Sequence, residues 1–149
     1  MIYIHSLGRA SRYYPERAAL AGDGTRLSFR ELNDRVNGIA AALTTRGFEA
    51  GDRLALLLPN GPAYIELVYA CALLGVIAVP LNTRLSAPEL DRVLADANPH
   101  GLVRHSSLPG LRRCDRRDSH GTGCSMKSRW NLETISIPTS LTPRKRFWP

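Results

Sequence analysis

The hydrophobic positions of the first hundred residues switch between two patterns. Apolar side chains at helical spacing predict helices, over residues 2–13, 29–46, 62–74 and 87–97. Short unbroken apolar runs predict strands, the first of them buried on both faces, over residues 54–58, 76–79 and 101–103. Strands and helices that alternate with short loops pack as a parallel sheet with flanking helices, so the predicted fold class is α/β.

Turn and cap residues mark the ends of these elements. Gly22, Asp23 and Gly24 predict a hairpin turn, because glycine accepts positive φ. The turn joins two short strands, over residues 17–21 and 26–27. Capping boxes, in which a serine and a glutamate three residues later exchange hydrogen bonds, are predicted at two helix starts; they are Ser28 with Glu31 and Ser86 with Glu89.

The pattern ends near residue 105. Residues 106–149 mix Ser, Thr, Pro, Arg and Gly without periodicity, and Pro138 cuts off the one alternating fragment, residues 135–137. A segment with so little apolar surface to bury is predicted to be largely disordered. The chain therefore divides into a domain at residues 1–105 and a basic tail at residues 106–149.

Charge divides the chain at the same place. The net charge is +7, but residues 1–105 carry 11 Arg, no Lys and 10 acidic residues, whereas residues 106–149 carry 9 Lys and Arg against 3 acidic residues. All 16 alanines lie at or before Ala97. Arg without Lys, together with abundant Ala, is typical of a GC-rich coding sequence, and such DNA read out of frame yields Arg, Pro, Ser, Gly and Cys. We therefore hypothesise a frameshift or a fused reading frame near residues 104–106.

The cysteines and the uncharged stretches exclude several classes of protein. Cys71 lies in an apolar run and is expected to be a buried thiol. Cys114 and Cys124 have nine residues between them, with His120 inside the interval, which is not the spacing of a structural zinc site. The longest uncharged stretch, residues 67–83, falls short of the ~20 residues that span a bilayer. With no signal-peptide pattern at its start, the chain is predicted to be cytoplasmic, with no metal and no membrane contact.

Five motifs follow one another in a fixed order. They are Leu27-Ser28-Phe29-Arg30-Glu31-Leu32-Asn33, Ala41-Ala42-Leu43 with Gly47, Gly51-Asp52-Arg53-Leu54-Ala55-Leu56-Leu57-Leu58-Pro59-Asn60, Ala70-Cys71-Ala72 and Leu74-Gly75-Val76-Ile77-Ala78-Val79-Pro80-Leu81-Asn82. This set resembles the N-terminal region of the AMP-forming adenylating enzymes, the acyl-CoA synthetases and their relatives. The resemblance covers about residues 8–104, and it implies the N-terminal piece of the adenylate-forming fold.

The resemblance also implies a reaction. Such enzymes convert a carboxylic acid, such as a fatty acid, and ATP to an acyl-adenylate and pyrophosphate, and usually pass the acyl group to coenzyme A. ATP, Mg²⁺ and coenzyme A are implied for the full-length family. The family's Ser/Thr/Gly-rich phosphate loop, its Tyr-Gly-x-Thr-Glu motif and its catalytic lysine come later and have no counterpart here. No catalytic, cofactor-binding or metal residue is therefore carried over, and a truncated chain is expected to be inactive alone and to bind none of these cofactors.

Two groups of polar residues are weaker candidates for a site. Residues 119–127 imitate a phosphate loop with glycines and a final lysine, but no strand precedes them, and an accidental likeness is the simpler interpretation. Asn60 and Asn82-Thr83-Arg84 follow apolar strands, where open α/β sheets bind ligands. The simpler interpretation is that these residues end the strands and satisfy backbone groups.

The surfaces that the predicted domain leaves exposed indicate which partners it could bind. Exposed sheet edges and apolar helix faces are expected to cause self-association or binding of a separately encoded remainder of the enzyme. The alternative is non-specific nucleic-acid binding by the tail. Its basic and aromatic residues are Arg112-Arg113, Arg116-Arg117 and Arg144-Lys145-Arg146 beside Phe147-Trp148, interrupted by Asp115 and Asp118.

Overall fold

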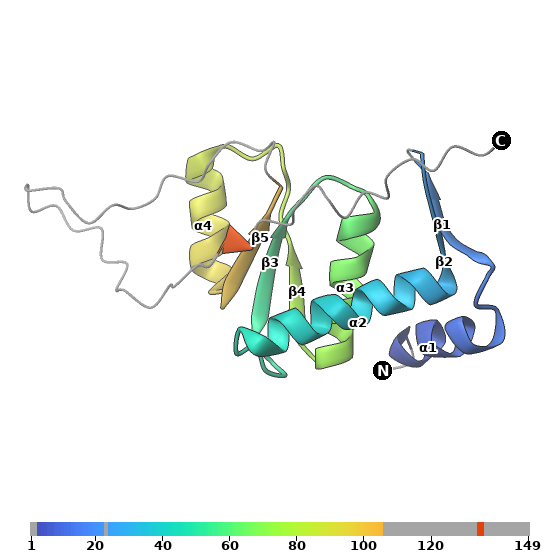
Figure 1. Ribbon diagram of the computed structural model, residues 1–149. Coiled ribbons are helices and arrows are strands. Elements are labelled where there is room, and N and C mark those ends of the chain that lie inside the picture. Colours follow the sequence, from blue (N-terminus) through green and yellow to red (C-terminus); the bar gives the residue numbers. More distant parts are fainter. Residues whose placement is uncertain (1–2, 23, 106–133, 136–149) are drawn as a thin grey trace, which may run out of the picture.

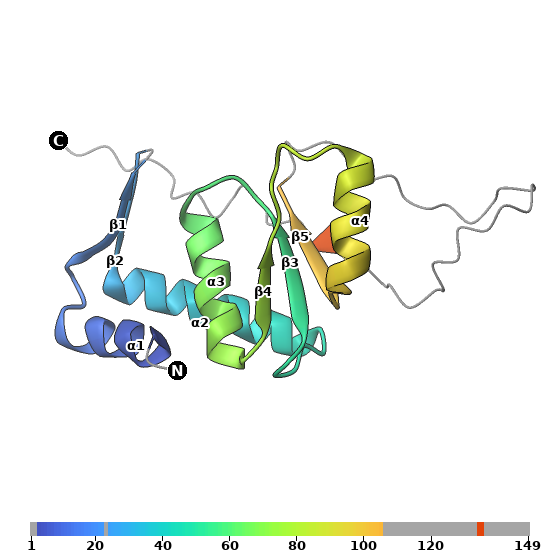
Figure 2. The same cartoon turned by 180° about the vertical axis from the view of Figure 1, so that it is seen from behind.

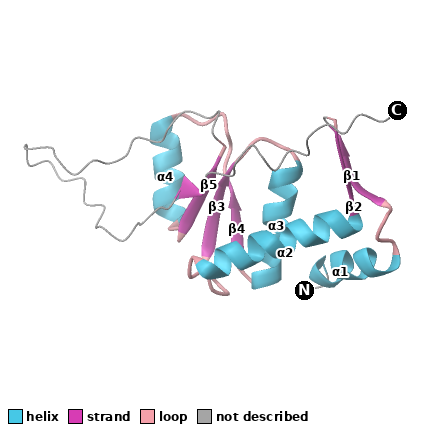
Figure 3. Cartoon of the chain, in the orientation of Figure 1, coloured by secondary structure: helices cyan, strands magenta, loops and turns pink. Residues whose placement is uncertain are grey.

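The computed structural model describes residues 3–22, 24–105 and 134–135 (Figure 1). Its helices are α1 (Tyr3–Tyr13), α2 (Phe29–Thr45), α3 (Pro62–Leu74) and α4 (Ala87–Ala97). Its strands are β1 (Ala18–Gly22), β2 (Thr25–Ser28), β3 (Arg53–Leu57), β4 (Ile77–Pro80), β5 (Gly101–Arg104) and β6 (Thr134–Ile135). Figure 3 shows the predicted alternation of strands and helices in the second half of the domain.

The larger sheet is parallel throughout, as predicted for an α/β fold. Its strand order is β4-β3-β5-β6, so β3 lies in the interior of the sheet. Leu54 of β3 is in register with Ala78 of β4 and Gly101 of β5. The strands β1 and β2 form a separate antiparallel hairpin around the predicted turn.

Both faces of β3 are buried, because successive side chains point to opposite sides of the sheet. Leu54 and Leu56 face a core formed with α1, α2 and α3. Ala55 and Leu57 face a smaller core, to which α4 contributes Leu90. Figures 1 and 2 show the resulting layers, with α4 on one side of the sheet and α2 and α3 on the other. The prediction of a strand buried on both faces is confirmed.

Two glycines allow backbone segments to approach closely. Gly75 ends α3 with φ +74°, and a Cβ atom there would lie 3.0 Å from the Cβ of Ala50. A Cβ atom on Gly101 would lie 2.7 Å from the ring of Phe48. The loop before β3 therefore packs directly on α3 and β5, which fixes the amino end of the sheet.

Both predicted capping boxes are present. At the start of α2, the backbone N–H of Ser28 donates to Glu31 Oε2 at 2.8 Å, and the N–H of Glu31 donates to Ser28 Oγ at 3.2 Å. At the start of α4, Glu89 Oε2 accepts from the N–H and the Oγ of Ser86, at 2.8 and 2.7 Å. Each box stabilises its helix by satisfying N–H groups that have no partner within the helix.

The segment predicted as a disordered tail contributes one short strand. Thr134 and Ile135 form β6, which pairs in parallel with Leu102 and Val103 of β5. It shares Ile135 with the alternating fragment at residues 135–137, and it extends the sheet beyond β5. The other residues of 106–149 lie outside the described residues. No helix in the described part of the chain has the length and apolar content needed to cross a membrane.

Candidate functional site

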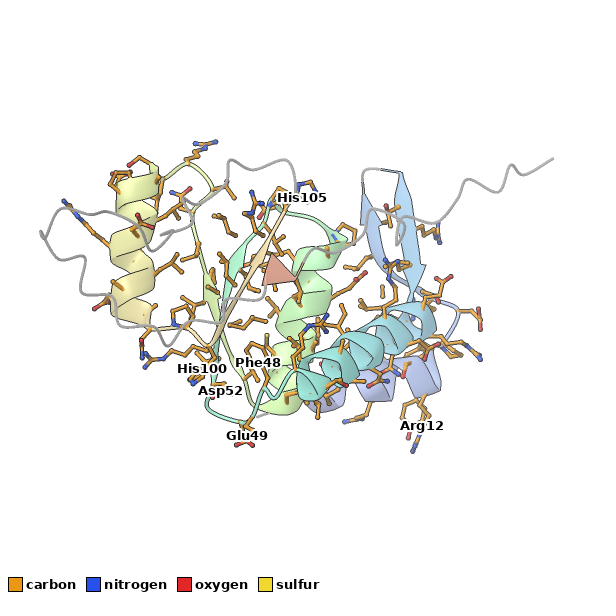
Figure 4. The ribbon with its side chains drawn as sticks, turned by 60° about the vertical axis from the view of Figure 1, so that its left-hand side comes forward. Arg12, Phe48, Glu49, Asp52, His100 and His105 are labelled. Atoms are coloured by element: carbon orange, nitrogen blue, oxygen red, sulfur yellow. The ribbon has the colours of Figure 1, made fainter. Side chains whose placement is uncertain are left out.

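The carboxyl ends of β3, β4 and β5 meet at one edge of the sheet, because the three strands are parallel and in register. Asn60 follows β3, residues 82–84 follow β4, and His105 follows β5. Figure 4 shows His105 at one end of the sheet, with Asp52 and His100 at the other end. Open α/β sheets bind ligands at the carboxyl ends of their strands, so this edge is the candidate site.

Asn82 orders the turn that leads into α4. Its Oδ1 accepts a hydrogen bond from the backbone N–H of Arg84 at 2.9 Å. Its carbonyl oxygen accepts from the N–H of Leu85 at 3.3 Å. An asparagine side chain bonded to the backbone two residues later is a common way to hold a turn. The geometry of Asn82 therefore favours the structural interpretation over a ligand-binding one.

Asn60 is exposed and lines a pocket of about 220 Å³. The other lining residues come from the β1–β2 hairpin, the β3–α3 loop and the start of α3; they are Leu20, Ala21, Gly22, Thr25, Gly61, Pro62 and Ile65. The sequence pattern predicts the hairpin but not its place beside Asn60, because that contact depends on tertiary packing. The pocket is lined by the candidate residue Asn60 and by residues of the hairpin that belong to none of the five motifs.

The lining of this pocket does not fit ATP. It offers polar side chains only at Thr25 and Asn60 and contains no lysine, arginine or histidine, whereas a triphosphate requires preorganised positive charge. Its volume is also below the roughly 300–1,000 Å³ of typical ligand pockets. Among the described residues, no three His, Cys, Asp or Glu side chains gather where they would hold Mg²⁺. No chemical step can therefore be assigned to these residues.

A polar network holds the opposite end of the sheet together (Figure 4). His100 Nε2 lies 3.2 Å from Asp52 Oδ1, and His100 Nδ1 accepts from the N–H of Arg53 at 3.3 Å. Asp52 Oδ2 accepts from the N–H of Glu49 at 2.9 Å, and Arg53 Nη1 donates to the carbonyl of Ala97 at 2.7 Å. The network joins the end of α4 to the start of β3. No motif predicts this network, because its residues are far apart in the sequence.

A buried ion pair joins α2 to α3, and the sequence pattern does not predict it either. Arg35 Nε lies 3.0 Å from Glu66 Oε1, and the Glu66 side chain is 3% exposed. Burial raises the pKa of the Glu66 carboxyl above 4.5, although the charge of Arg35 acts in the opposite direction. The pair lies between helices of the core rather than in the pocket at Asn60, so its role is structural.

Of the three cysteines, Cys71 is the one among the described residues. Cys71 is 1% exposed in the core between α3 and the sheet, as predicted. Burial raises the pKa of its thiol to about 11, which keeps the thiol protonated at neutral pH. Cys114 and Cys124 lie outside the described residues, as do the glycine-containing segment at 119–127 and the basic clusters of the tail. Predictions for those residues stay predictions.

Comparison with known sequences agrees with the motifs. The family described as AMP-binding enzyme matches residues 7–142 of the chain. The match begins close to where the motif resemblance begins and continues past residue 105. The division of the chain at residues 105 and 106 stays a prediction.

Curated relatives include enzymes with aromatic and with aliphatic acids in their names. A feruloyl-CoA synthase from Amycolatopsis sp is 44% identical over 95 residues, or 64% of this chain and 19% of that protein. The long-chain-fatty-acid–CoA ligase FadD13 of Mycobacterium tuberculosis is 44% identical over 78 residues, or 52% of this chain and 16% of that protein. The peroxisomal benzoate–CoA ligase of Arabidopsis thaliana is 31% identical over 139 residues, or 93% of this chain and 23% of that protein. The chain thus spans about a fifth of the length of these relatives.

Solved structures share the fold of the described residues. The O-succinylbenzoate coenzyme A synthetase of Bacillus subtilis, in complex with AMP, superposes with a TM-score of 0.65 and 36% identity, over 69% of this chain and 27% of that chain. A long-chain fatty-acid CoA ligase from Rhodopseudomonas palustris, itself described as putative, gives a TM-score of 0.68 and 36% identity, over 71% of this chain and 27% of that chain. The described fold is that of the N-terminal domain of adenylate-forming enzymes.

Proposed function

Because this chain belongs to the AMP-binding enzyme family, we propose that it forms part of an enzyme that joins a carboxylic acid to coenzyme A. The family match over residues 7–142, together with relatives named as CoA synthases and CoA ligases, carries the proposal. In the proposed reaction, the acid and ATP form an acyl-adenylate and pyrophosphate. The acyl group then passes to the thiol of coenzyme A.

The described residues supply scaffold in this proposal, and the groups that bind ATP, Mg²⁺ and coenzyme A belong to the rest of the enzyme. Two observations support this division. The pocket at Asn60 has no cationic side chain, and the chain spans 19% of the feruloyl-CoA synthase to which it is similar. The chain by itself is therefore expected to be inactive. A cytoplasmic location belongs to the same proposal.

The substrate class is a carboxylic acid. Relatives carry the names of aromatic acids, such as ferulate and benzoate, and of long-chain fatty acids. A role in fatty acid metabolism is one branch of the proposal, and activation of an aromatic acid is the other. Exchange of pyrophosphate into ATP, measured with a panel of both kinds of acid, distinguishes the branches.

The same exchange reaction tests whether the chain needs the rest of the enzyme for activity. The chain alone is expected to give no exchange above buffer with any acid of the panel, with an intact CoA ligase as the positive control. Exchange catalysed by the isolated chain would contradict its proposed inactivity. Supplying the rest of an AMP-binding enzyme as a second polypeptide should establish exchange.

The change of reading frame hypothesised near residues 104–106 has two observations against it. The family match continues to residue 142, and β6, which lies after residues 104–106, extends the parallel sheet. Sequencing the gene and translating the region in all three frames decides the matter. Family motifs that appear only in a shifted frame would support the change of frame.

Nucleic-acid binding by the tail is the competing proposal. It is supported by the excess of basic over acidic residues in residues 106–149, 9 against 3. Contacts of this kind weaken steeply with salt, because they release counterions from the phosphates. If the retention of DNA stays strongly salt-dependent after residues 106–149 are deleted, the tail is not the segment that binds DNA.

A further inference from the structure

The helix α3 is apolar on its solvent side as well as on its core side. A helix at the surface of a soluble domain normally turns its charged side chains to solvent and its apolar side chains to the core. Glu66 is the one charged residue of α3, and it is buried against Arg35 of α2. The solvent side of α3 therefore carries no charge.

Six partly exposed apolar residues on the side of α3 next to Glu66 form what we term the outer face of α3. They follow each other at helical spacing and are Tyr64, Ile65, Val68, Tyr69, Ala72 and Leu73. Val68 and Leu73 are 36% and 42% exposed, and the other four are half-buried. In Figure 1 α2 crosses in front of α3, whereas in Figure 2, from behind, no described element crosses in front of it. Val68 and Leu73 are thus the exposed part of the outer face, whereas Tyr64 and Tyr69 also pack against the core.

The apolar surface continues onto β4, which is an edge strand among the described residues. Ile77 is 48% exposed there. The N–H groups of Ile77 and Leu81 donate toward β3, so Ala78 and Pro80 between them face away from it. Because proline has no N–H, this short edge is a poor template for an added strand. A partner would therefore contact side chains rather than extend the sheet.

A hollow of about 80 Å³ opens beside the outer face. Tyr69 and Leu73 belong to both the hollow and the outer face. The remaining lining residues come from α1 and α2; they are Leu7, Gly8, Asn33, Val36 and Asn37. A side chain of a partner that lies on α3 has a place to insert here.

We propose that the outer face of α3 is the docking surface for the rest of an AMP-binding enzyme, meaning the portion beyond the region matched by this chain. The inference rests on the proposed function. The B. subtilis synthetase is covered by this chain over 27% of its length, so the greater part of such an enzyme lies outside the matched region. Among the described helices, α2 and α4 turn charged residues outward, such as Asp34 and Arg92. The uncharged outer face of α3 is the surface that fits an apolar protein interior.

The experiment uses the complete chain with an affinity tag. It is co-expressed with one of two probes: the Amycolatopsis feruloyl-CoA synthase or FadD13, each lacking the segment that matches this chain. The wild-type chain is expected to retain at least one probe during purification. Val68→Glu and Leu73→Glu each place a charge in the interface and are expected to reduce the retained probe about tenfold or more. Val93→Glu on α4 is the matched control, because Val93 is 38% exposed, much as Val68 is.

Each outcome supports or overturns the docking surface. Failure of the wild-type chain to retain either probe overturns it, as does an equal loss with Val93→Glu. So does a homodimer of the chain that Val68→Glu disrupts while no probe is retained. Circular dichroism checks that each variant is folded, and if Val68→Glu is not, Leu73→Gln takes its place. A retained probe that yields no pyrophosphate exchange with any acid would instead refute the proposed function and leave the docking surface standing.

Discussion

The helices α3 and α4 begin alike and differ in what they cover. Each follows a strand of the parallel sheet and has a proline near its start. α4 carries a capping box, buries Leu90 and turns charged residues outward. α3 has no side-chain cap, buries Glu66 and exposes Val68. α4 therefore has the pattern of a surface helix, whereas α3 has the composition of a helix enclosed on all sides.

The largest expected effect comes from the charge that α3 buries. Arg35→Met leaves the Glu66 carboxylate buried without its cation and is expected to reduce the free energy of unfolding by about 3–5 kcal/mol near neutral pH. The raised pKa of Glu66 means that the folded state favours the protonated carboxyl. Stability from this group is therefore greatest at low pH and is lost as pH rises from about 4.5 through the raised pKa.

Urea denaturation of the wild type and Arg35→Met, at about pH 5 and about pH 8, measures this effect. The loss should be larger at the higher pH. The double variant Arg35→Met, Glu66→Leu removes both charges and is the control, expected to recover most of the stability. An equal loss at both pH values would show that Glu66 is not responsible.

Truncation of one leucine on each helix compares the two cores. Leu67 of α3 is 2% exposed in the core shared with α1 and α2, and Leu90 of α4 is 7% exposed in the smaller core. Leu67→Ala is expected to cost about 3–5 kcal/mol of unfolding free energy and Leu90→Ala about 2–3 kcal/mol, because the larger core relaxes less around a cavity. Urea denaturation measures the unfolding free energy of both variants. A larger loss for Leu90→Ala than for Leu67→Ala would contradict the prediction.

The cap of α4 contributes less and depends on pH. Ser86→Ala is expected to cost about 1 kcal/mol of unfolding free energy. Hydrogen bonds from the Ser86 side chain and backbone lower the pKa of Glu89 below 4.5. The stability they add is present above that pH and is lost as pH falls through the lowered pKa. Thermal unfolding across this range tests the prediction, with Glu89→Gln as the variant that lacks the pH-dependent part.

The smallest expected effect is chemical and leaves stability unchanged. The thiol of Cys71, with its pKa raised to about 11, is expected to react slowly with a thiol reagent in the folded chain and rapidly in urea. Cys114→Ser and Cys124→Ser remove the other two thiols, so that the signal reports Cys71 alone. Rapid labelling of the folded chain would place this side of α3 in solvent and contradict the buried core.

Most of the fold could be predicted because its signals are local. The capping boxes, the hairpin glycines and the apolar run of β3 each lie within a few neighbouring residues, and the structure confirms them. The element boundaries differ by one residue in places, as at Pro80, which joins β4. The family resemblance is also confirmed, because its motifs lie in the scaffold that the described residues form.

The candidate site could be predicted only in part. The strand order placed Asn60 and Asn82 at one edge of the sheet, but the hairpin wall of the pocket depends on packing between distant segments. The pairs of Arg35 with Glu66 and of Asp52 with His100 likewise join residues that no short motif links. Glu66, the charged residue of an otherwise uncharged helix, is the feature of the sequence that distinguishes α3.

Protection of a single cysteine tests the docking surface most directly. Val68→Cys and Val93→Cys are made separately in the chain that carries Cys114→Ser and Cys124→Ser, where Cys71 stays buried. Each is labelled with a maleimide, alone and with the retained feruloyl-CoA synthase probe. A docking surface at the outer face of α3 predicts that the bound probe slows labelling at position 68 about tenfold or more and leaves labelling at position 93 unchanged. Equal labelling at position 68 with and without the bound probe would contradict it.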